Sequence, residues 1–547
     1  MGSATLRTDV LVVGAGPTGL MAANWLDRLG VDALAIDAKS GPTRESRALG
    51  VQARTMEIYR QLGVVDAVRE RVVLATELRP GVGRRALGSV PLGRLGYALT
   101  PFPGLHILEQ SANEEILAGR LAERGRPVLW DHAFASLSRT GPGDAAEEGP
   151  GVRVSVRGPD GPVAILARYV VAADGASSPV RESLGIGFRG RTNAHVFYVL
   201  DANGVTGSGS GINLRVSAED FMLAFPMGPD GRGGRRYRLL GIVRDDGGAP
   251  SAGPAGHPTG FPAAGAGDTT VDEARARASL AEEFGFGYTD AQWFATYRVH
   301  HRVADVFRAG GVFLAGDAAH IHSPVGAQGM NTGLQDAHNL ACKLADVLAG
   351  RMPEAYLDRY EAERRPVALR LVGTTDRAFS VITSTGRLAR LVRTVVLPAL
   401  WPVGLRVVPR SPAGGRLFGY LSQIRIHYWM TEGERRRADA ARGPARWTRR
   451  GKVLGRRLPW VSAGEHGGAD NHAALGDAAW QVHAYGPRAA AKGVEVAARH
   501  ALPLRRFDAA PARNLPDGTV VVVRPDMFVA ELHPPEPAGR HRRRRRG

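Results

Sequence analysis

Apolar residues follow two alternating patterns in the N-terminal part of the chain. Residues 9–13 form a short and almost wholly apolar run, which is typical of a buried strand. In the next segment Leu20, Ala23 and Leu26 recur at the spacing of a helix that buries one face. A second apolar run, residues 33–36, follows. The pattern predicts a strand–helix–strand unit and an α/β fold.

The same pattern returns between Gly310 and Asp346, with a long loop between strand and helix. The parts are an apolar run at 312–315, the pair Gly316-Asp317, and loop residues Pro324, Gly326 and Gly329. We expect a helix from about Asn331, because the apolar positions beyond it are three or four residues apart. This arrangement directs backbone N–H groups and a helix dipole at an anionic or electron-rich ligand, and it is also the pattern of an ordinary crossover.

Later segments predict further elements. A strand pattern dominates residues 188–243. Residues 356–365 predict a charged helix that ends at Pro366, and a long helical region is expected to continue to about Leu400. Near the C-terminus, residues 480–484 and 519–524 have the composition of strands and are separated by a helical stretch. We therefore expect a second sheet and a small C-terminal α/β domain.

Composition excludes several classes of protein. Of the 547 residues, 44% are hydrophobic, which is ample for the cores of two or three domains. Cys342 is the only cysteine, which excludes an intramolecular disulfide framework and a cysteine-rich metal cluster and fits a reducing cytoplasm. We expect no metal site. We also expect no signal peptide and no membrane span, which needs about 20 nearly uncharged residues.

The net charge of +18 comes almost entirely from arginine. Much of it is concentrated in a run of arginines that begins at Arg540 and ends one residue before the C-terminus. A nucleic-acid partner bound through this run is one interpretation. We favour a solvated, disordered tail in residues 538–547 and expect no nucleic-acid partner.

The turn after the first strand has the sequence GAGPTG. In this context Gly14 permits a tight turn, Gly16 lets a pyrophosphate approach the backbone, and Gly19 lets the helix pack closely on the strand. Asp37 ends the second strand about 20 residues further on, where a carboxylate hydrogen-bonds a ribose hydroxyl. Together these residues predict a Rossmann-like domain that binds an ADP-containing cofactor.

Three further residues are candidates for the same site. Arg47 lies where a cation can neutralise a pyrophosphate, although in an arginine-rich chain it can equally be a surface residue. Gln110 precedes an amphipathic helix, and Asp174 ends an apolar run as part of an Asp-Gly pair. On its own, none of the three identifies a ligand.

Four stretches together resemble the motifs of a known family. They are GAGPTG, SRALGVQARTMEIYRQLG, AADGASSPVR and AGDAAHIHSPVGAQGMNTGLQDAHNLACKLA. In this order they closely resemble the FAD-dependent aromatic hydroxylases, the single-component flavoprotein monooxygenases related to p-hydroxybenzoate hydroxylase. The resemblance covers about residues 8–375. The C-terminal part is more weakly similar to the thioredoxin-like appendage of the phenol and polyketide hydroxylases.

The resemblance implies an FAD site in which each motif residue has a role. Gly14, Gly16 and Gly19 are implied to cradle the pyrophosphate, and Asp37, which is usually Glu in the family, to bind the adenosine ribose. The implied contacts of the remaining residues are Arg47 with the pyrophosphate or ribityl region, Gln110 with the ribityl chain, Asp174 with FAD and NAD(P)H, Gly316 and Asp317 with the ribityl hydroxyls, and Pro324, Gly329, Met330 and Asn331 with the isoalloxazine.

The resemblance also implies a reaction. NADPH or NADH reduces FAD, O₂ adds at flavin C4a, and the hydroperoxide delivers an OH to a phenolic or polyketide-type ring. Because the cofactor makes the oxidant, no catalytic side chain is assigned. Phe197, Met222 and Phe225 are candidates for the substrate wall. Baeyer–Villiger oxygenation of a polyketide ketone and a non-catalytic flavin-containing ligand-binding protein remain alternatives, as do a monomer and a homodimer.

The expected architecture is a mixed α/β (α+β) fold with several domains. A discontinuous Rossmann-like FAD-binding domain is expected in residues 1–187 and 300–400, with an inserted β-sheet substrate domain in 188–299. A helical connector in 401–452 is expected to lead to a thioredoxin-like domain in 453–537, which has no CxxC motif.

Overall fold

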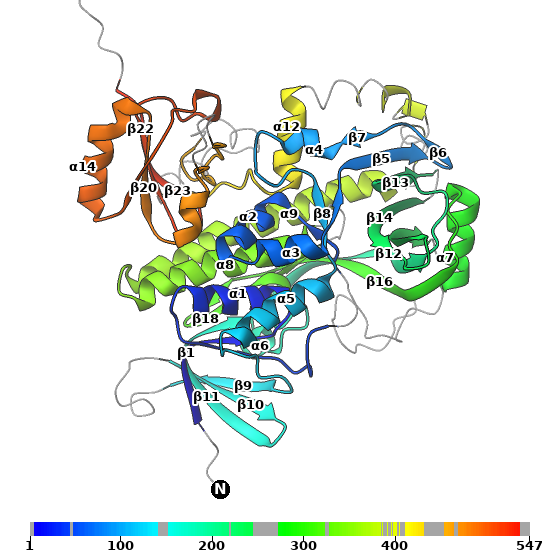
Figure 1. Cartoon of the computed structure of the whole chain (residues 1–547). Coiled ribbons are helices and arrows are strands. Elements are labelled where there is room, and N and C mark those ends of the chain that lie inside the picture. Colours follow the sequence, from blue (N-terminus) through cyan, green and yellow to red (C-terminus); the bar gives the residue numbers. More distant parts are fainter. Residues whose placement is uncertain are drawn as a thin grey trace, which may run out of the picture. The chain divides into compact units, whose positions relative to one another are not determined.

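The chain folds into two compact units. The first contains residues 1–97 and 102–423, and the second contains residues 98–101 and 424–547 (Figure 1). The computed structural model describes residues 5–43, 48–140, 151–217, 220–243, 272–322, 328–383, 386, 391, 395–396, 398–401, 404, 411–430, 453–463 and 469–536. Arg47, Pro324 and the predicted arginine tail lie outside these residues.

A seven-stranded sheet forms the base of the first unit. Its strands are β1 (Thr5–Val13), β2 (Ala33–Ile36), β9 (Ala133–Arg139), β10 (Val152–Gly158), β11 (Gly161–Ala172), β17 (Arg308–Ala309) and β18 (Val312–Leu314). Strands β18, β11, β1 and β2 are adjacent and parallel, so their carboxyl ends meet at one edge. Residues 10–13 of β1 are buried, as their continuous apolar run predicts.

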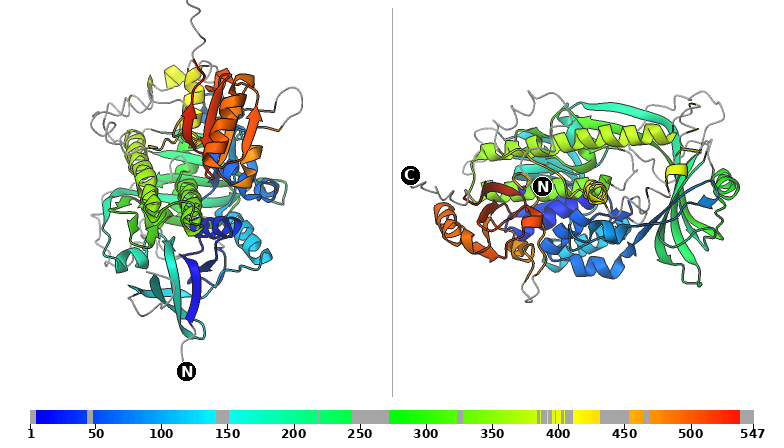
Figure 2. Two further views of the ribbon diagram at one scale, coloured as in Figure 1. Left: turned by 90° about the vertical axis from the view of Figure 1, so that its left-hand side faces the viewer. Right: turned by 90° about the horizontal axis from the view of Figure 1, so that it is seen from above.

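Helices cover this sheet and join its strands. They are α1 (Pro17–Arg28), α5 (Gln110–Glu123), α6 (Pro179–Ser183), α8 (Gly329–Leu348) and α9 (Asp358–Thr383). Helices α8 and α9 lie side by side (Figure 2). Tyr360 of α9 donates a hydrogen bond of 2.7 Å to the Leu314 carbonyl of β18, which joins α9 to the sheet.

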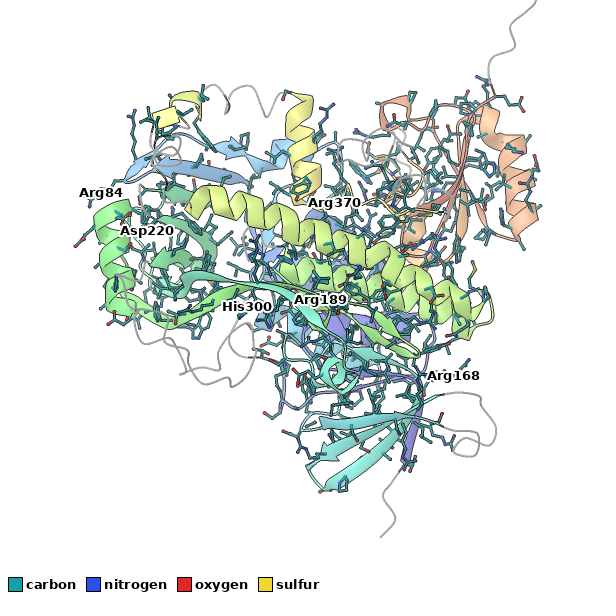
Figure 3. The ribbon with its side chains drawn as sticks, turned by 180° about the vertical axis from the view of Figure 1, so that it is seen from behind. Arg84, Arg168, Arg189, Asp220, His300 and Arg370 are labelled. Atoms are coloured by element: carbon teal, nitrogen blue, oxygen red, sulfur yellow. The ribbon has the colours of Figure 1, made fainter. Side chains whose placement is uncertain are left out.

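A second sheet of nine strands lies in the same unit. Its strands are β5 (Glu77–Val82), β6 (Arg85–Ala86), β7 (Val90–Pro91), β12 (Phe188–Asn203), β13 (Ile212–Val216), β14 (Phe221–Pro229), β15 (Arg235–Val243), β16 (Asp290–Ala304) and β19 (His320–Ile321). Arg189 of β12 and His300 of β16 mark the two longest strands (Figure 3). One face packs against α7 (Glu273–Ser279) and the π-helical turn Leu280–Phe284.

Smaller elements complete the first unit. They are the three-stranded sheet of β3 (Gly50–Val51), β4 (Val73–Ala75) and β8 (Leu105–Ile107), the helices α2 (Ala53–Leu62), α3 (Val65–Arg71), α4 (Leu92–Gly96) and α12 (Pro412–Leu421), and the 3₁₀ turns Gly316–Ala318 and Glu354–Leu357.

The second unit is built on a four-stranded sheet. The strand order is β21 (Leu504–Phe507), β20 (Gln481–Tyr485), β22 (Thr519–Val523) and β23 (Val529–His533). Helix α14 (Ala490–His500) packs on one face through Val496. Residues of alternating parity on β22 enter two separate cores, one on each face. This confirms the strands and the helix expected near the C-terminus.

Two expected helix boundaries differ from the structure. Helix α8 begins at Gly329, two residues before the expected start at Asn331. The predicted end at Pro366 is wrong, because α9 continues through this proline to Thr383. A proline inside a helix removes one backbone hydrogen bond. Here the tertiary contacts of Tyr360 and Arg364 hold the preceding turns in place.

Candidate functional site

A cavity of about 1010 Å³ opens at the carboxyl edge of the parallel strands. It is lined by residues that follow β1, β2 and β11, by Asp317 after β18, and by the first residues of α8. In doubly wound sheets this edge is where ligands bind, because the loops and helix N-termini converge there. The cavity continues to the second sheet, which supplies Val199, Phe225 and Leu240.

The three glycines of the first turn have distinct surroundings. Gly14 has a φ of +98°, and a Cβ there would lie 2.4 Å from the Ala173 carbonyl oxygen. A Cβ on Gly19 would lie 1.8 Å from the Gly14 carbonyl oxygen. Gly16 lines the cavity, and no atom lies within 4 Å of the position of its Cβ. Gly14 and Gly19 therefore permit close packing, whereas Gly16 leaves room for a ligand to approach the backbone.

The Asp37 carboxylate is hydrogen-bonded to this glycine turn. Its Oδ2 accepts a hydrogen bond of 2.5 Å from the Ala15 amide, and its Oδ1 accepts one of 2.8 Å from the Lys39 amide. Helix α1 starts with Pro17 and Thr18 at the cavity and has no side-chain cap at Gly16. The end of β2 and the N-terminus of α1 thus form one polar surface, suited to a phosphate and an adjoining sugar.

Gln110 starts helix α5 and lines the cavity. Its Oε1 accepts a hydrogen bond of 3.1 Å from the Ala48 amide, and its Nε2 donates one of 2.9 Å to Glu114. Glu114 also forms a 3.3 Å ion pair with Lys39. The segment beyond β2 is therefore held to α5 by charged and amide groups at the cavity.

Asp174 lies in the cavity wall at the end of β11. Its Oδ2 accepts a hydrogen bond of 3.1 Å from the Val180 amide, whereas its buried Oδ1 has no hydrogen-bond partner among the described residues. Burial is the main cause that raises the pKa of Asp174 to about 6. A buried carboxylate oxygen of this kind needs a donor, and a sugar hydroxyl or a nucleotide supplies one.

Arg181 connects the loops that follow β11 and β18. It donates hydrogen bonds of 2.9 Å to the Ala176 carbonyl and 3.1 Å to the Ala318 carbonyl. Its guanidinium also lies 4.0 Å from the centre of the Phe188 ring. The residue holds the loops of Asp174 and Asp317 at a fixed separation.

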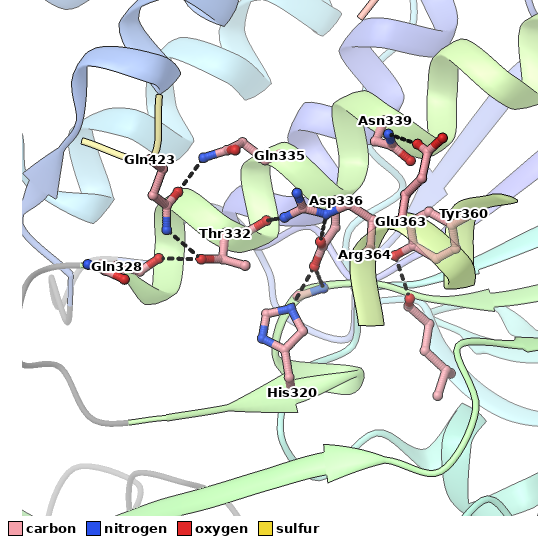
Figure 4. A network of polar contacts seen from close by, with 12 residues as sticks. His320, Gln328, Thr332, Gln335, Asp336, Asn339, Tyr360, Glu363, Arg364 and Gln423 are labelled. Atoms are coloured by element: carbon pink, nitrogen blue, oxygen red, sulfur yellow. Dashed lines mark hydrogen bonds and ion pairs between the residues drawn. The ribbon is translucent and has the colours of Figure 1, made fainter. Parts of the chain in front are cut away.

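A second buried carboxylate, Asp336 of α8, holds the turn that carries Asp317 (Figure 4). It accepts hydrogen bonds from the Gly316 amide at 3.2 Å, His320 Nε2 at 2.7 Å and Arg364 Nε at 2.6 Å. Gly316 has a φ of +60°, which a side chain rarely adopts. Asp317 itself is exposed to the cavity.

The N-terminus of α8 faces the same cavity. Gln328, Gly329 and Met330 line it, and the side chain of the N-cap residue Gln328 does not cap the helix. Asn331 is fully buried, accepts hydrogen bonds from the Gln52 amide at 2.9 Å and Thr55 at 2.7 Å, and donates one of 2.7 Å to the Gly50 carbonyl. Asn331 does not line the cavity, and its contacts fix the direction of the helix.

The structure brings only one of the three expected wall residues to the cavity. Phe225 lines it. Met222 belongs to the core against α7, on the other face of the sheet, because residues 222 and 225 have opposite parity on β14. Phe197 is on the cavity-facing side but is fully buried beside its register partner Tyr297, with the two ring centres 5.6 Å apart.

Four wall residues were not expected from the sequence. They are Val199, Arg238, Leu240 and Tyr297. Arg238 forms two hydrogen bonds of 2.6 Å with Asp201, which lies directly opposite it on β12. Arg238 follows Arg235 and Arg236 on β15, so the local sequence does not distinguish it as a wall residue.

The site fits FAD in several ways that do not depend on a bound group. Two helix N-termini whose N-cap residues make no capping bond, an open glycine and four carboxylates (Asp37, Glu114, Asp174 and Asp317) line a single cavity, which extends to the second sheet. Uncapped helix ends stabilise phosphates and electron-rich rings, and carboxylates bind sugar hydroxyls. The fold and the cavity define a Rossmann-type flavoprotein.

Comparisons with known proteins agree with this class. The model of the FAD binding domain family matches residues 7–375. The 12-dehydrotetracycline 5-monooxygenase/anhydrotetracycline 6-monooxygenase of Streptomyces rimosus is 36% identical over 69% of this chain and 70% of its own length. A rifampicin monooxygenase of Rhodococcus hoagii is 32% identical over 71% of this chain and 74% of its own length.

Solved structures extend the similarity to nearly the whole chain. The anhydrotetracycline hydroxylase OxyS of Streptomyces rimosus has a TM-score of 0.69 at 30% identity and covers 97% of this chain and 96% of its own. The aromatic hydroxylase CabE from angucycline biosynthesis has a TM-score of 0.70 at 30% identity, with 97% of both chains covered.

The chain belongs to the FAD binding domain family and is an FAD-dependent monooxygenase. The expected mixed α/β fold with a Rossmann-type FAD domain is confirmed. None of the described helices has both the length and the apolar composition needed to cross a membrane.

Proposed function

We propose that the enzyme hydroxylates a polycyclic phenolic substrate of the polyketide type, with NAD(P)H and O₂ as co-substrates. The observation that carries this proposal is the continuity of one cavity from the nucleotide-binding turn, past the N-terminus of α8, to an apolar wall. The relatives named for tetracycline and angucycline chemistry support the same class of substrate.

The overall reaction balances with one reductant and one O₂. The aromatic C–H, O₂, NAD(P)H and a proton give the phenol, water and NAD(P)⁺. FAD, when bound, accepts the hydride and supplies the activated oxygen. The glycine turn and Asp37 are placed to hold the nucleotide end, and Asp317 to hold the sugar chain.

The N-terminus of α8 is placed to stabilise negative charge. A helix N-terminus carries a partial positive charge that stabilises a nearby anion by up to about 2 kcal/mol when partly buried. Gln328, Gly329 and Met330 present this end to the cavity. A ring of the cofactor that becomes anionic on reduction is therefore favoured at this position.

The wall residues serve to orient the substrate and to exclude water. Val199, Phe225 and Leu240 are apolar, and water exclusion protects a reactive oxidant from unproductive decay. Burial raises the pKa of Tyr297 well above its ordinary value, so this wall residue stays uncharged.

Rapid-mixing kinetics of the FAD-loaded enzyme test the proposal. We expect polyhydroxylated anthraquinones and related tetracyclic phenols to accelerate flavin reduction by NADPH or NADH, and the product to gain one oxygen atom with its ring system intact. A product with an expanded lactone ring would instead establish Baeyer–Villiger oxygenation. Reduction that no aromatic ligand accelerates, together with no oxygenated product, would overturn the proposal.

A further inference from the structure

The substrate wall contains an arginine whose charge is already neutralised. Arg238 on β15 and Asp201 on β12 are register partners, and both hydrogen bonds between them, Nε to Oδ1 and Nη2 to Oδ2, measure 2.6 Å. Arg238 is 2% exposed and Asp201 9% exposed. Two parallel bonds of this kind fix the plane of the guanidinium.

The pair lies among the residues that face the substrate. Arg238, Leu240 and Tyr297 line the cavity together, and the Arg238 guanidinium lies 5.7 Å from the centre of the Trp293 ring. A guanidinium carries N–H donors and no acceptor. The wall therefore combines hydrogen-bond donor chemistry with a net charge of zero.

The described residues of the second sheet bring no further charged side chain to the cavity. Besides Arg238, this sheet lines the cavity with five uncharged residues, which are Val199, Phe225, Leu240, Tyr297 and Ile321. A buried carboxylate without a compensating cation is strongly unfavourable, because its desolvation is not offset.

We infer that the Asp201–Arg238 pair selects uncharged polycyclic phenols and quinones and rejects aromatic carboxylates. Arg238 binds a phenol or quinone oxygen of the substrate, and Asp201 cancels the charge that would otherwise recruit a carboxylate. This inference rests on the proposed function and specifies its substrate class. It makes Asp201 a specificity determinant that acts through Arg238.

Two ligands that differ by one carboxylate test the inference. The probes are 1,8-dihydroxyanthraquinone and its 3-carboxylate, whose binding to the oxidised FAD-loaded enzyme is followed by the change in the flavin absorbance at pH 7. We expect the wild-type enzyme to bind the uncharged ligand at least tenfold more tightly. Asp201→Asn leaves Arg238 with its positive charge, and we expect it to shift the ratio of the two dissociation constants at least tenfold towards the carboxylate.

Glu273→Gln is the matched control, because Glu273 forms an ion pair with Arg277 on the α7 side of the same sheet. We expect this variant to keep the wild-type ratio. A wild-type preference for the carboxylate would overturn the inference, as would an unchanged ratio in FAD-loaded Asp201→Asn.

A second variant covers the case in which Asp201→Asn does not fold. The double substitution Asp201→Leu with Arg238→Met removes both charges together, and such replacements of a buried pair are often tolerated. We expect it to lose the preference for 1,8-dihydroxyanthraquinone over unsubstituted anthraquinone, and a retained preference would overturn the role of Arg238. Both measurements are of binding, so an enzyme that shows the ratios but no turnover would refute the proposed function alone.

Discussion

Gln423 donates a hydrogen bond of 2.9 Å to the hydroxyl of Thr332, in the first turns of α8. Thr332 in turn donates one of 2.9 Å to the Gln328 carbonyl, directly at the cavity, and Gln335 donates to Gln423 Oε1 (Figure 4). Gln423 lies beyond residue 375, where the family match ends. A residue outside the family domain therefore supports the helix end that faces the flavin site.

Replacement of Gln423 should loosen this helix end. Gln423 has a φ of +58°, so Gln423→Gly removes the side chain without adding backbone strain. The change removes the acceptor of the buried Gln335 side chain and the donor to the Thr332 hydroxyl, at a cost of about 1–3 kcal/mol. We expect weaker FAD binding and more H₂O₂ released per NAD(P)H oxidised, measured by flavin fluorescence and peroxide assay.

Gln481→Ala provides a comparison for that experiment. Gln481 is a buried glutamine of the second unit that donates a hydrogen bond of 2.7 Å to the Ala474 carbonyl. The substitution should reduce stability but leave FAD affinity unchanged. Equal FAD affinity in both variants would contradict the supporting role of Gln423.

Asp37→Ala should weaken FAD binding by about 10- to 100-fold, because hydrogen bonds to a charged group contribute about 1.5–3 kcal/mol each. The loss has two sources, the ribose contact and the bond from the Ala15 amide that shapes the glycine turn. Asp37→Glu should recover most of the affinity, since it keeps the carboxylate. Equilibrium dialysis of FAD against both variants measures the difference, and an unchanged affinity in Asp37→Ala would exclude this role.

Met222 and Phe225 should respond differently to truncation. Met222→Ala creates a cavity in the core against α7 and should lower the free energy of unfolding by about 2–5 kcal/mol, with little effect on KM. Phe225→Ala changes the substrate wall and should raise KM or the uncoupled fraction roughly tenfold or more. Denaturant unfolding and steady-state kinetics of both variants check the assignment, which fails if Met222→Ala alters substrate discrimination.

Acid should destabilise the second unit through His483. Burial, with a smaller contribution from Arg505, lowers the pKa of His483 from 6.5 to about 3. The unfolded chain then binds the proton more readily below pH 6.5, so stability falls as the pH decreases from 6.5 towards 3, by about 2 kcal/mol at pH 5. His483→Gln should reduce the pH dependence of thermal unfolding between pH 7 and 5. An identical dependence in the variant would show that His483 is not the cause.

The parts of the site that the sequence predicts are those encoded by local spacing. Gly14, Gly16 and Gly19 occur in one turn, and Asp37 ends the next strand, so their positions follow from the strand–helix–strand pattern alone. The Asp336 and Gln423 contacts join residues distant in sequence, and no local pattern encodes them. Met222 and Phe225 lie on opposite faces of β14, and because residues of both faces are apolar, the composition of the strand does not show which face lines the cavity.

One face of the second sheet packs against α7 and the other lines the cavity, and this separation affects how the substrate range can evolve. Residues of one parity on β14 belong to the core with α7, whereas those of the other parity lie on the opposite face, where Phe225 lines the cavity. The residues proposed to hold the nucleotide follow strands of the other, seven-stranded sheet. The substrate range can therefore change through substitution of a few cavity-lining residues, such as Phe225 and Leu240, without changes to the residues that hold the cofactor.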